Sequence, residues 1–220
     1  ACVTVGSGQA ASTFAIVNVC QAGDNFVSST DLYGGTVNLF THTLKKLGIE
    51  VRYADPSDPK NFEKAIDDRT RCFYAETLPN PALRVFPIKE VSDIGRKHNI
   101  PLIMDNTAAP IICKPLDHGA DIVMYSATKH IDGQGRVLGG AILGSQKFCD
   151  EKIKPFVRNT GPSTNSSSIG SIHLNGISHD KTFNPGASPP LDKNDIRLTS
   201  CFKEPCTDAN NNLSAVINID

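Results

Sequence analysis

Short apolar segments alternate with amphipathic segments along the first 160 residues of the chain. Period-two or continuous apolar runs predict strands at residues 1–6, 25–29, 49–55, 70–76, 100–106 and 120–126. Apolar positions at helical spacing predict helices at residues 9–20, 34–48, 58–68 and 88–99. Strands that alternate with helices are typical of a mostly parallel sheet with helices on both faces. We therefore predict an α/β fold for residues 1–160.

The pattern ends near residue 160. Residues 161–190 are rich in Ser, Asn, Gly and Pro and follow neither periodicity, and beyond them two short runs, 195–202 and 213–219, have the composition of strands. We expect one α/β domain over residues 1–160 and an irregular, loop-rich tail over residues 161–220, without a second domain.

Composition and charge narrow the possible partners. The 220 residues carry 22 Lys and Arg against 23 Asp and Glu, a net charge of −1, which gives no reason to expect nucleic acid as a partner. No run reaches the roughly 18 apolar residues of a membrane span. The 7 cysteines form no CxxC pair and lie at no metal-ligand spacing, so we expect no metal, reduced thiols and a cytoplasmic protein.

Polar clusters follow four of the predicted strands. They are the segments SGQ at residues 7–9, ETLPN at 76–80, DNT at 105–107 and SATK at 126–129. In parallel sheets with flanking helices, ligands bind at the carboxyl ends of the strands. The four clusters are therefore expected to form one site at one edge of the sheet.

The residue types in these clusters indicate a particular cofactor. Asp105 ends an apolar strand, so its shielded carboxylate needs a cationic or protonated partner, and Lys129 follows the next strand. Ser7, Gly8 and Gln9 open a helix, whose first amides suit a phosphate. A phosphate, a protonated ring nitrogen and an amine-reactive carbonyl together describe pyridoxal phosphate, PLP. Each signal taken alone has an ordinary explanation, such as a helix-start glycine or a solvated lysine.

Several longer motifs carry a family resemblance. They are GSGQAA, GDNFVSSTDLYGGT, ETLPNP, MDNTAAPIICKPLDHGADIV, YSATKHIDGQG and FVRNTGPS, in this order along the chain. With them, residues 1–163 resemble the Cys/Met-metabolism family of PLP enzymes: cystathionine synthases and lyases, methionine γ-lyase and O-acylhomoserine sulfhydrylases. Within the family, GQGR at 133–136 and DLYGGTVNLF at 31–40 are more similar to the sulfhydrylases, because the lyases usually carry GHG or GHS after the lysine.

The resemblance implies a role for each matching residue. Lys129 is expected to form the Schiff base with the cofactor aldehyde and then to move protons, which needs a lysine whose charged form is locally disfavoured. Asp105 is expected to keep the pyridine nitrogen protonated. Tyr33 is expected to stack on the ring and to assist proton transfer. Asn80 is expected to contact the ring hydroxyl or the substrate.

The phosphate is expected to be held by backbone amides at the first helix and by hydroxyls after the lysine-bearing strand. The residues that the resemblance assigns to it are Ser7, Gly8, Gln9, Ser126 and Thr128.

The sequence departs from the family pattern at both ends. Family members have an N-terminal segment whose Tyr-x-Arg motif reaches the phosphate of a neighbouring subunit, and we expect this chain to lack that segment. They also have a C-terminal domain with an arginine for the substrate carboxylate. The segment IRLTS at 196–200 is faintly similar to the strand that carries it and makes Arg197 a weak candidate, although chance or a surface strand explains five residues more often.

Three functional hypotheses follow. The leading one is PLP-dependent γ-replacement, in which sulfide or a thiol replaces the γ-substituent of O-acetyl- or O-succinylhomoserine. With sulfide the product is homocysteine. The second is a cystathionine γ-synthase or a methionine or cystathionine γ-lyase. The third is an inactive fragment or pseudoenzyme of the family. The resemblance also implies a homo-oligomer, a dimer or tetramer, with no nucleic-acid or membrane partner.

Overall fold

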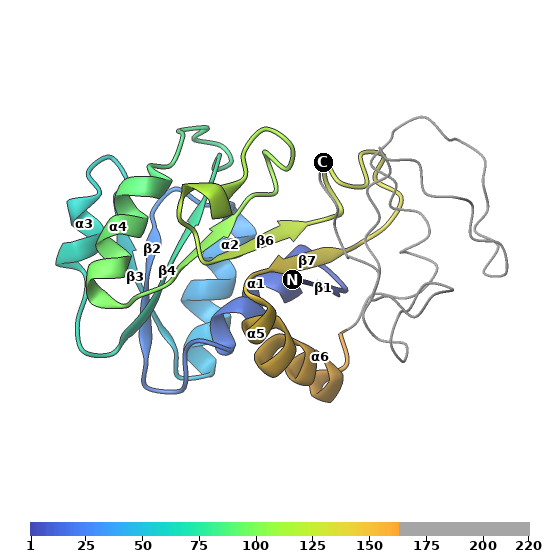
Figure 1. Ribbon diagram of the computed structural model, residues 1–220, viewed down its shortest axis with the longest axis horizontal. Coiled ribbons are helices and arrows are strands. Elements are labelled where there is room, and N and C mark those ends of the chain that lie inside the picture. The colour runs from blue at the N-terminus through green and yellow to red at the C-terminus, as the bar shows by residue number, and fades with distance from the viewer. Residues whose placement is uncertain (163–220) are drawn as a thin grey trace, which may run out of the picture.

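The structure, a computed structural model, describes residues 1–162 (Figure 1). The predicted tail from residue 163 onward, the two predicted strands within it and the candidate Arg197 lie outside the described residues.

One seven-stranded sheet organises residues 1–162, in the order β1-β7-β6-β5-β4-β2-β3. Its strands are β1 (Cys2–Val5), β2 (Asn25–Ser29), β3 (Glu50–Ala54), β4 (Thr70–Glu76), β5 (Leu102–Asp105), β6 (Ile122–Ser126) and β7 (Gly140–Leu143). All six predicted strands are confirmed, and five of them, β2 to β6, pair with one another in parallel. The sequence prediction omitted β7, which pairs antiparallel with both β1 and β6, so β1 still runs in the same direction as β6.

The helices cover both faces of the sheet, as predicted. They are α1 (Gly8–Val17), α2 (Gly34–Asn38), the π-helix η1 (Leu39–Leu44), α3 (Lys60–Lys64), α4 (Ile88–His98), the 3₁₀-helix η2 (Pro115–His118), α5 (Gln146–Phe148), the π-helix η3 (Cys149–Ile153) and α6 (Lys154–Thr160). The helix predicted at 58–68 is shorter than expected and occupies only α3. No helix within residues 1–162 is both long and apolar enough to cross a bilayer.

Local signals in the sequence explain where several helices begin and end. The side chain of Ser7 accepts a hydrogen bond from Ala10 N at 3.1 Å and caps the start of α1. The helix that begins with α2 stops before Gly48, which has a φ of +76°. Asn99 ends α4 in the left-handed conformation, at the end expected from the sequence.

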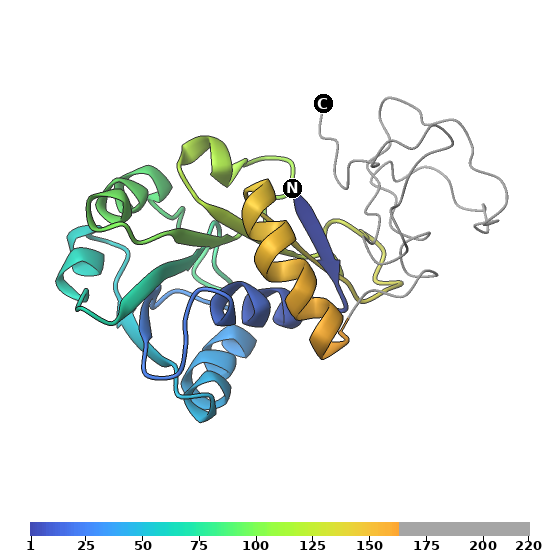
Figure 2. The same cartoon turned by 60° about the horizontal axis from the view of Figure 1, so that its bottom comes forward.

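Two apolar layers hold the helices against the sheet. On the face covered by α3 and α4 (Figure 1), Phe62 packs edge-on against Phe73, with the ring centroids 5.5 Å apart. On the other face, Phe40 packs edge-on against Phe26 and Tyr74, at 4.9 and 4.8 Å. In Figure 2, the side of the sheet on which α1 and α6 lie faces the viewer. Because helices fill both faces, ligand binding is confined to the edges of the sheet.

Candidate active site

A cavity of about 680 Å³ lies at the carboxyl ends of the parallel strands. Ligand sites for small molecules usually measure about 300–1,000 Å³. The four polar clusters of the sequence all contribute to its lining. Nine of the predicted site residues line it together, namely Ser7, Gly8, Gln9, Tyr33, Asn80, Asp105, Ser126, Thr128 and Lys129.

At one side of the cavity the start of α1 lies against the end of β6. A Cβ added to Gly8 would come within 2.5 Å of the Ser126 Cβ, so a residue with a side chain does not fit there without a shift. The first amides of a helix have no acceptor within the helix and point outward from its start. Gly8 and Gln9 therefore present donors beside the Ser126 side chain, an arrangement that suits an anion.

Thr128 and Ser7 each have a structural contact in addition to their place in the lining. The Thr128 Oγ1 accepts from Gly139 N at 3.1 Å, which ties the turn after β6 to the residue before β7. The Ser7 Oγ accepts the capping bond from Ala10 N. Because a hydroxyl can donate while it accepts, Ser7 keeps a proton for a ligand oxygen, whereas the Thr128 hydroxyl also donates to Gly139 O at 3.4 Å.

Lys129 lies in the turn that follows β6. Its backbone amide donates to Ser126 O at 3.3 Å, and its carbonyl accepts from Gly133 N at 2.8 Å. The side chain lines the cavity but is exposed. Residues 1–162 thus hold the lysine backbone in place but leave its side chain exposed. A Schiff-base lysine needs a desolvated amine, and a bound ligand or another segment would have to provide that desolvation.

Asp105, at the end of β5, points its carboxylate at the same cavity. Its Oδ1 accepts from Thr107 N at 2.9 Å, and Thr107 Oγ1 in turn accepts from Ser126 N at 2.7 Å. Burial raises the pKa of Asp105 above its usual value, although the bonds from Thr107 and Tyr74 act in the opposite direction. No cation pairs with Asp105 within residues 1–162, so a protonated nitrogen in the cavity would satisfy it.

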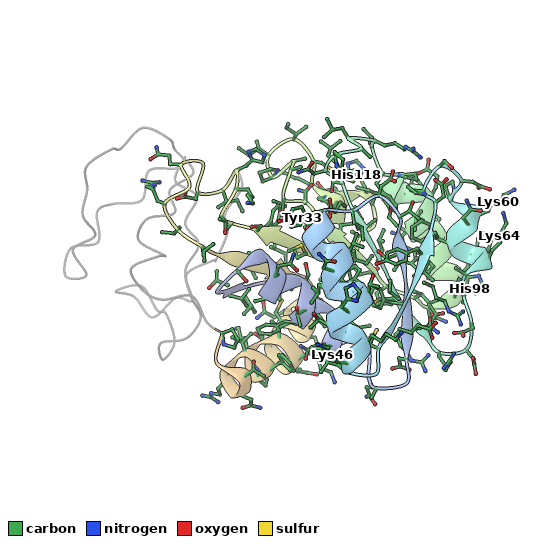
Figure 3. The ribbon with its side chains drawn as sticks, turned by 180° about the vertical axis from the view of Figure 1, so that it is seen from behind. Tyr33, Lys46, Lys60, Lys64, His98 and His118 are labelled. Carbon is green, nitrogen blue, oxygen red and sulfur yellow. The ribbon has the colours of Figure 1, made fainter. Side chains whose placement is uncertain are left out.

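Tyr33 stands at the start of α2, at the opposite end of this helical segment from Lys46 (Figure 3). Its side chain is 52% exposed and lines the cavity. A Cβ on Gly35 would lie 2.5 Å from the Tyr33 Cε1, so the glycine allows the ring to lie close to the backbone. The ring is thus available for a planar ligand.

A second carboxylate, that of Glu76, lies in the cavity; the predicted ETLPN cluster includes it, but the sequence prediction gave it no role. It ends β4 and pairs in register with Asp105 on β5, and it is only 6% exposed. Burial, and then the charge of Asp105, raises the pKa of Glu76 to about 7. The signal was present in the sequence, because Glu76 ends an apolar strand just as Asp105 does.

A buried hydroxyl pair beneath the cavity was also missed. The Tyr74 hydroxyl and Ser12 Oγ lie 3.0 Å apart, and Ser12 lines the cavity. Burial raises the pKa of Tyr74 well above its usual value, and the charge of Asp105 adds to the shift. The Tyr74 hydroxyl therefore stays neutral beside Asp105, and its hydrogen bond lowers the pKa of that carboxylate.

Comparison with known proteins places this site in a family. The family model described as Cys/Met metabolism PLP-dependent enzyme matches residues 1–177. The chain belongs to this family. Its members use PLP, as the residue types at the strand ends had indicated.

Individual relatives agree with the family. An O-acetyl-L-homoserine sulfhydrylase from Leptospira meyeri is 46% identical over 159 residues, which are 71% of this chain and 36% of the relative. The structure of a Campylobacter jejuni protein described as an O-acetylhomoserine (thiol)-lyase, which contains N'-pyridoxyl-lysine-5'-monophosphate, matches with a TM-score of 0.65 and 40% identity, covering 68% of this chain and 37% of that one.

A lyase is also among the structural relatives. Cystathionine γ-lyase from Lactobacillus plantarum, in complex with L-serine, matches with a TM-score of 0.72 and 32% identity, covering 76% of this chain and 44% of that one. The chain spans about a third of the length of the sulfhydrylase from Leptospira meyeri.

The residues of the cavity fit PLP. The glycine-lined contact between α1 and β6 offers donors for a phosphate, and Asp105 is a carboxylate without a cation among the described residues. Lys129 lines the same cavity with its side chain exposed, and Tyr33 lies at its wall. These are the groups that a phosphate, a ring nitrogen, an aldehyde and an aromatic ring each require.

Proposed function

We propose that this chain provides the PLP site of an enzyme that replaces the γ-substituent of O-acetyl- or O-succinylhomoserine with sulfide and so forms homocysteine. The observation that carries the proposal is the convergence of nine predicted residues on one cavity, including Lys129, Asp105 and the start of α1. Homology supports the choice of reaction, because a relative at 46% identity is an O-acetyl-L-homoserine sulfhydrylase.

In this proposal the bound PLP supplies an electron sink next to the amino-acid nitrogen. Lys129 would hold the cofactor through its amine and, once the substrate amine has displaced it, would remove and return the proton at the substrate Cα. Asp105 holds the proton on the ring nitrogen. Tyr33 stacks on the ring and exchanges a proton near the leaving group.

The remaining cavity residues bind and orient. The amides of Gly8 and Gln9 and the hydroxyls of Ser126 and Thr128 hold the phosphate, with Ser7 at the same helix start. Asn80 contacts the ring hydroxyl or the substrate. Arg197 stays a weak prediction for the substrate carboxylate, since it lies outside the described residues.

A γ-lyase or a cystathionine γ-synthase is the second candidate, because a cystathionine γ-lyase is a structural relative at 32% identity. The products separate the reactions. A sulfhydrylase keeps the substrate nitrogen in homocysteine, a synthase keeps it in cystathionine, and a lyase releases it as ammonia.

The test uses the purified 220-residue chain. PLP is added and its visible absorbance is followed, and O-acetylhomoserine and sulfide are then supplied while homocysteine and ammonia are measured. We expect a cofactor band that Lys129→Ala abolishes, followed by homocysteine. A chain that binds no PLP would support the third hypothesis, an inactive fragment or pseudoenzyme.

We further propose that the working form is a homo-oligomer. Large apolar side chains on the described residues are between 65% and 87% exposed, namely Leu83, Val85, Ile111, Ile112 and Leu138. Ile111 and Ile112 are adjacent, and contiguous exposed apolar surface often marks a protein–protein interaction site. Sedimentation alongside a PLP titration tests this, and a monodisperse monomer with nanomolar PLP affinity would contradict it.

A further inference from the structure

Glu76 occupies a position that the proposed chemistry does not use. It is the last residue of β4, lies beside Asp105 in the sheet register and is 6% exposed. Within residues 1–162 its carboxylate forms no ion pair. A buried carboxylate without a counter-ion is costly unless hydrogen bonds satisfy it, so the partners that Glu76 does have are informative.

The one hydrogen-bond partner of this carboxylate among the described residues is a backbone amide from a separate loop. Tyr33 N donates to Glu76 Oε1 at 2.7 Å, across 43 positions of sequence. The amide of Asn80, in a second loop, lies close enough to lower the pKa of Glu76. Tyr33 and Asn80 are the residues assigned to the ring and to the ring hydroxyl or substrate. One side chain thus connects two loops that line the cavity.

The hydrogen bond from Tyr33 N to Glu76 links the start of α2 to strand β4. The Tyr33 side chain does not cap the helix, and its carbonyl bonds only forward along the chain, accepting from Thr36 N at 2.9 Å and Val37 N at 3.1 Å. The amide of Tyr33 points the other way, to Glu76. The placement of the tyrosine against β4 therefore rests on a hydrogen bond to the Glu76 carboxyl group.

We infer that Glu76 is a positioning residue, whose carboxylate holds the Tyr33 and Asn80 loops at the cavity wall and thereby sets how tightly the cavity binds PLP. The second half of this inference, the effect on PLP binding, rests on the proposed function. A purely structural role predicts lower stability alone, whereas a positioning role predicts a local loosening at Tyr33 together with weaker cofactor binding.

The test compares Glu76→Ala and Glu76→Gln with a control, Asp121→Asn. Asp121 Oδ2 accepts from Leu102 N at 2.8 Å, the same kind of carboxylate-to-amide bond at the opposite end of the sheet, although Asp121 is exposed. Hydrogen exchange at individual amides is measured on the PLP-free 220-residue chains, and PLP is then titrated into each.

We expect Glu76→Ala to speed exchange at Tyr33, Thr36 and Val37 and to weaken PLP binding about tenfold or more. Glu76→Gln keeps a carbonyl acceptor and should restore most of both properties. Asp121→Asn should speed exchange at Leu102 and leave PLP affinity unchanged.

Two results would overturn the inference. One is unchanged exchange at Tyr33 in Glu76→Ala, or in Glu76→Gln if the alanine variant does not fold. The other is weakened PLP binding in Glu76→Gln while Tyr33 stays protected, since charge and not position would then be responsible. If the unmodified chain binds no PLP, the proposed function fails together with the affinity half, and the exchange data still decide whether Glu76 holds the loop.

Discussion

Carboxylates at the amino ends of the parallel strands have charged partners within residues 1–162, whereas the carboxylates that end β4 and β5 do not. At the amino ends, Asp67 accepts from Asn25 Nδ2 at 2.8 Å and pairs with Arg52 at 2.7 Å, and Asp24 pairs with Arg71 at 3.0 Å. These contacts satisfy each charge within the fold. The hydrogen bond from Asn25, followed by smaller contributions that include the charge of Arg52, lowers the pKa of Asp67 to about 2.

At the carboxyl ends, Glu76 and Asp105 lie side by side, and neither has an ion pair within residues 1–162. Burial raises the pKa of both. Within the described residues, the carboxylates at one end of the sheet are thus paired with cations, whereas two desolvated carboxylates at the other end are not. A fold retains such uncompensated groups where a ligand meets them, which locates the function without reference to any relative.

The largest effect is expected from removing the charge at the functional end. Asp105→Ala should leave PLP bound but lower turnover about 1,000-fold, roughly 4 kcal/mol, because the ring nitrogen loses the group that keeps it protonated. Homocysteine formation and PLP absorbance in the same samples measure this. Turnover within tenfold of the unmodified chain would remove Asp105 from the proposed chemistry.

The next effect is a pH dependence of stability. Glu76 has a folded pKa of about 7 against the ordinary 4.5, so between these values the folded chain holds a proton that the unfolded chain has lost. Stability should therefore fall as pH rises through this window, by at most about 3 kcal/mol. The raised pKa of Asp105 acts in the same direction.

Urea unfolding of the PLP-free chain at about pH 5 and about pH 8 measures the difference, with Glu76→Gln as the matched variant. The variant should lose most of the slope. An equal slope in both proteins would show that Glu76 ionises normally.

A smaller effect is expected at the helix start. Gly8→Ala places a Cβ against Ser126 and should move the first turn of α1 away from β6. Overpacking of this kind typically costs about 1–3 kcal/mol, and we expect PLP affinity to fall about tenfold. Gly34→Ala is the control, because nothing lies within 4 Å of its added Cβ. Equal PLP affinity in the two variants would argue against a phosphate site at Gly8.

The smallest functional effect is expected from the amino end. Asp67→Asn should lower the melting temperature and leave PLP affinity unchanged, because Asp67 serves the fold. The contribution of this carboxylate is present above its unfolded pKa of 3.8 and is lost as pH falls through about 2. A large loss of PLP binding in this variant would break the contrast between the two ends.

Much of this arrangement is predictable from sequence because it is local. An apolar run followed by a polar residue identifies a strand end, and parallel strands bring their carboxyl ends to one edge, which is how Ser7, Asp105 and Ser126 could be assigned to one cavity. Strand β7 was missed because it follows a glycine-rich segment and is defined by pairing with β1, which is distant in sequence.

Glu76 shows a second limit of sequence reasoning. The segment YAETLPN shows that Glu76 ends an apolar strand, but it gives the side chain no role. Its importance comes from the register with Asp105 and from the amide of Tyr33, and neither contact has a local signature. Positions that act through long-range contacts become visible only once the strands are paired.

The central claim, that the carboxyl edge of the sheet binds PLP through Lys129, is tested most directly by chemical trapping. The 220-residue chain is incubated with PLP, reduced with borohydride and digested, and the peptides are mapped by mass spectrometry. The account predicts a reduced pyridoxyl group on Lys129. A label on Lys114 or Lys147 instead, or on no lysine, would contradict it.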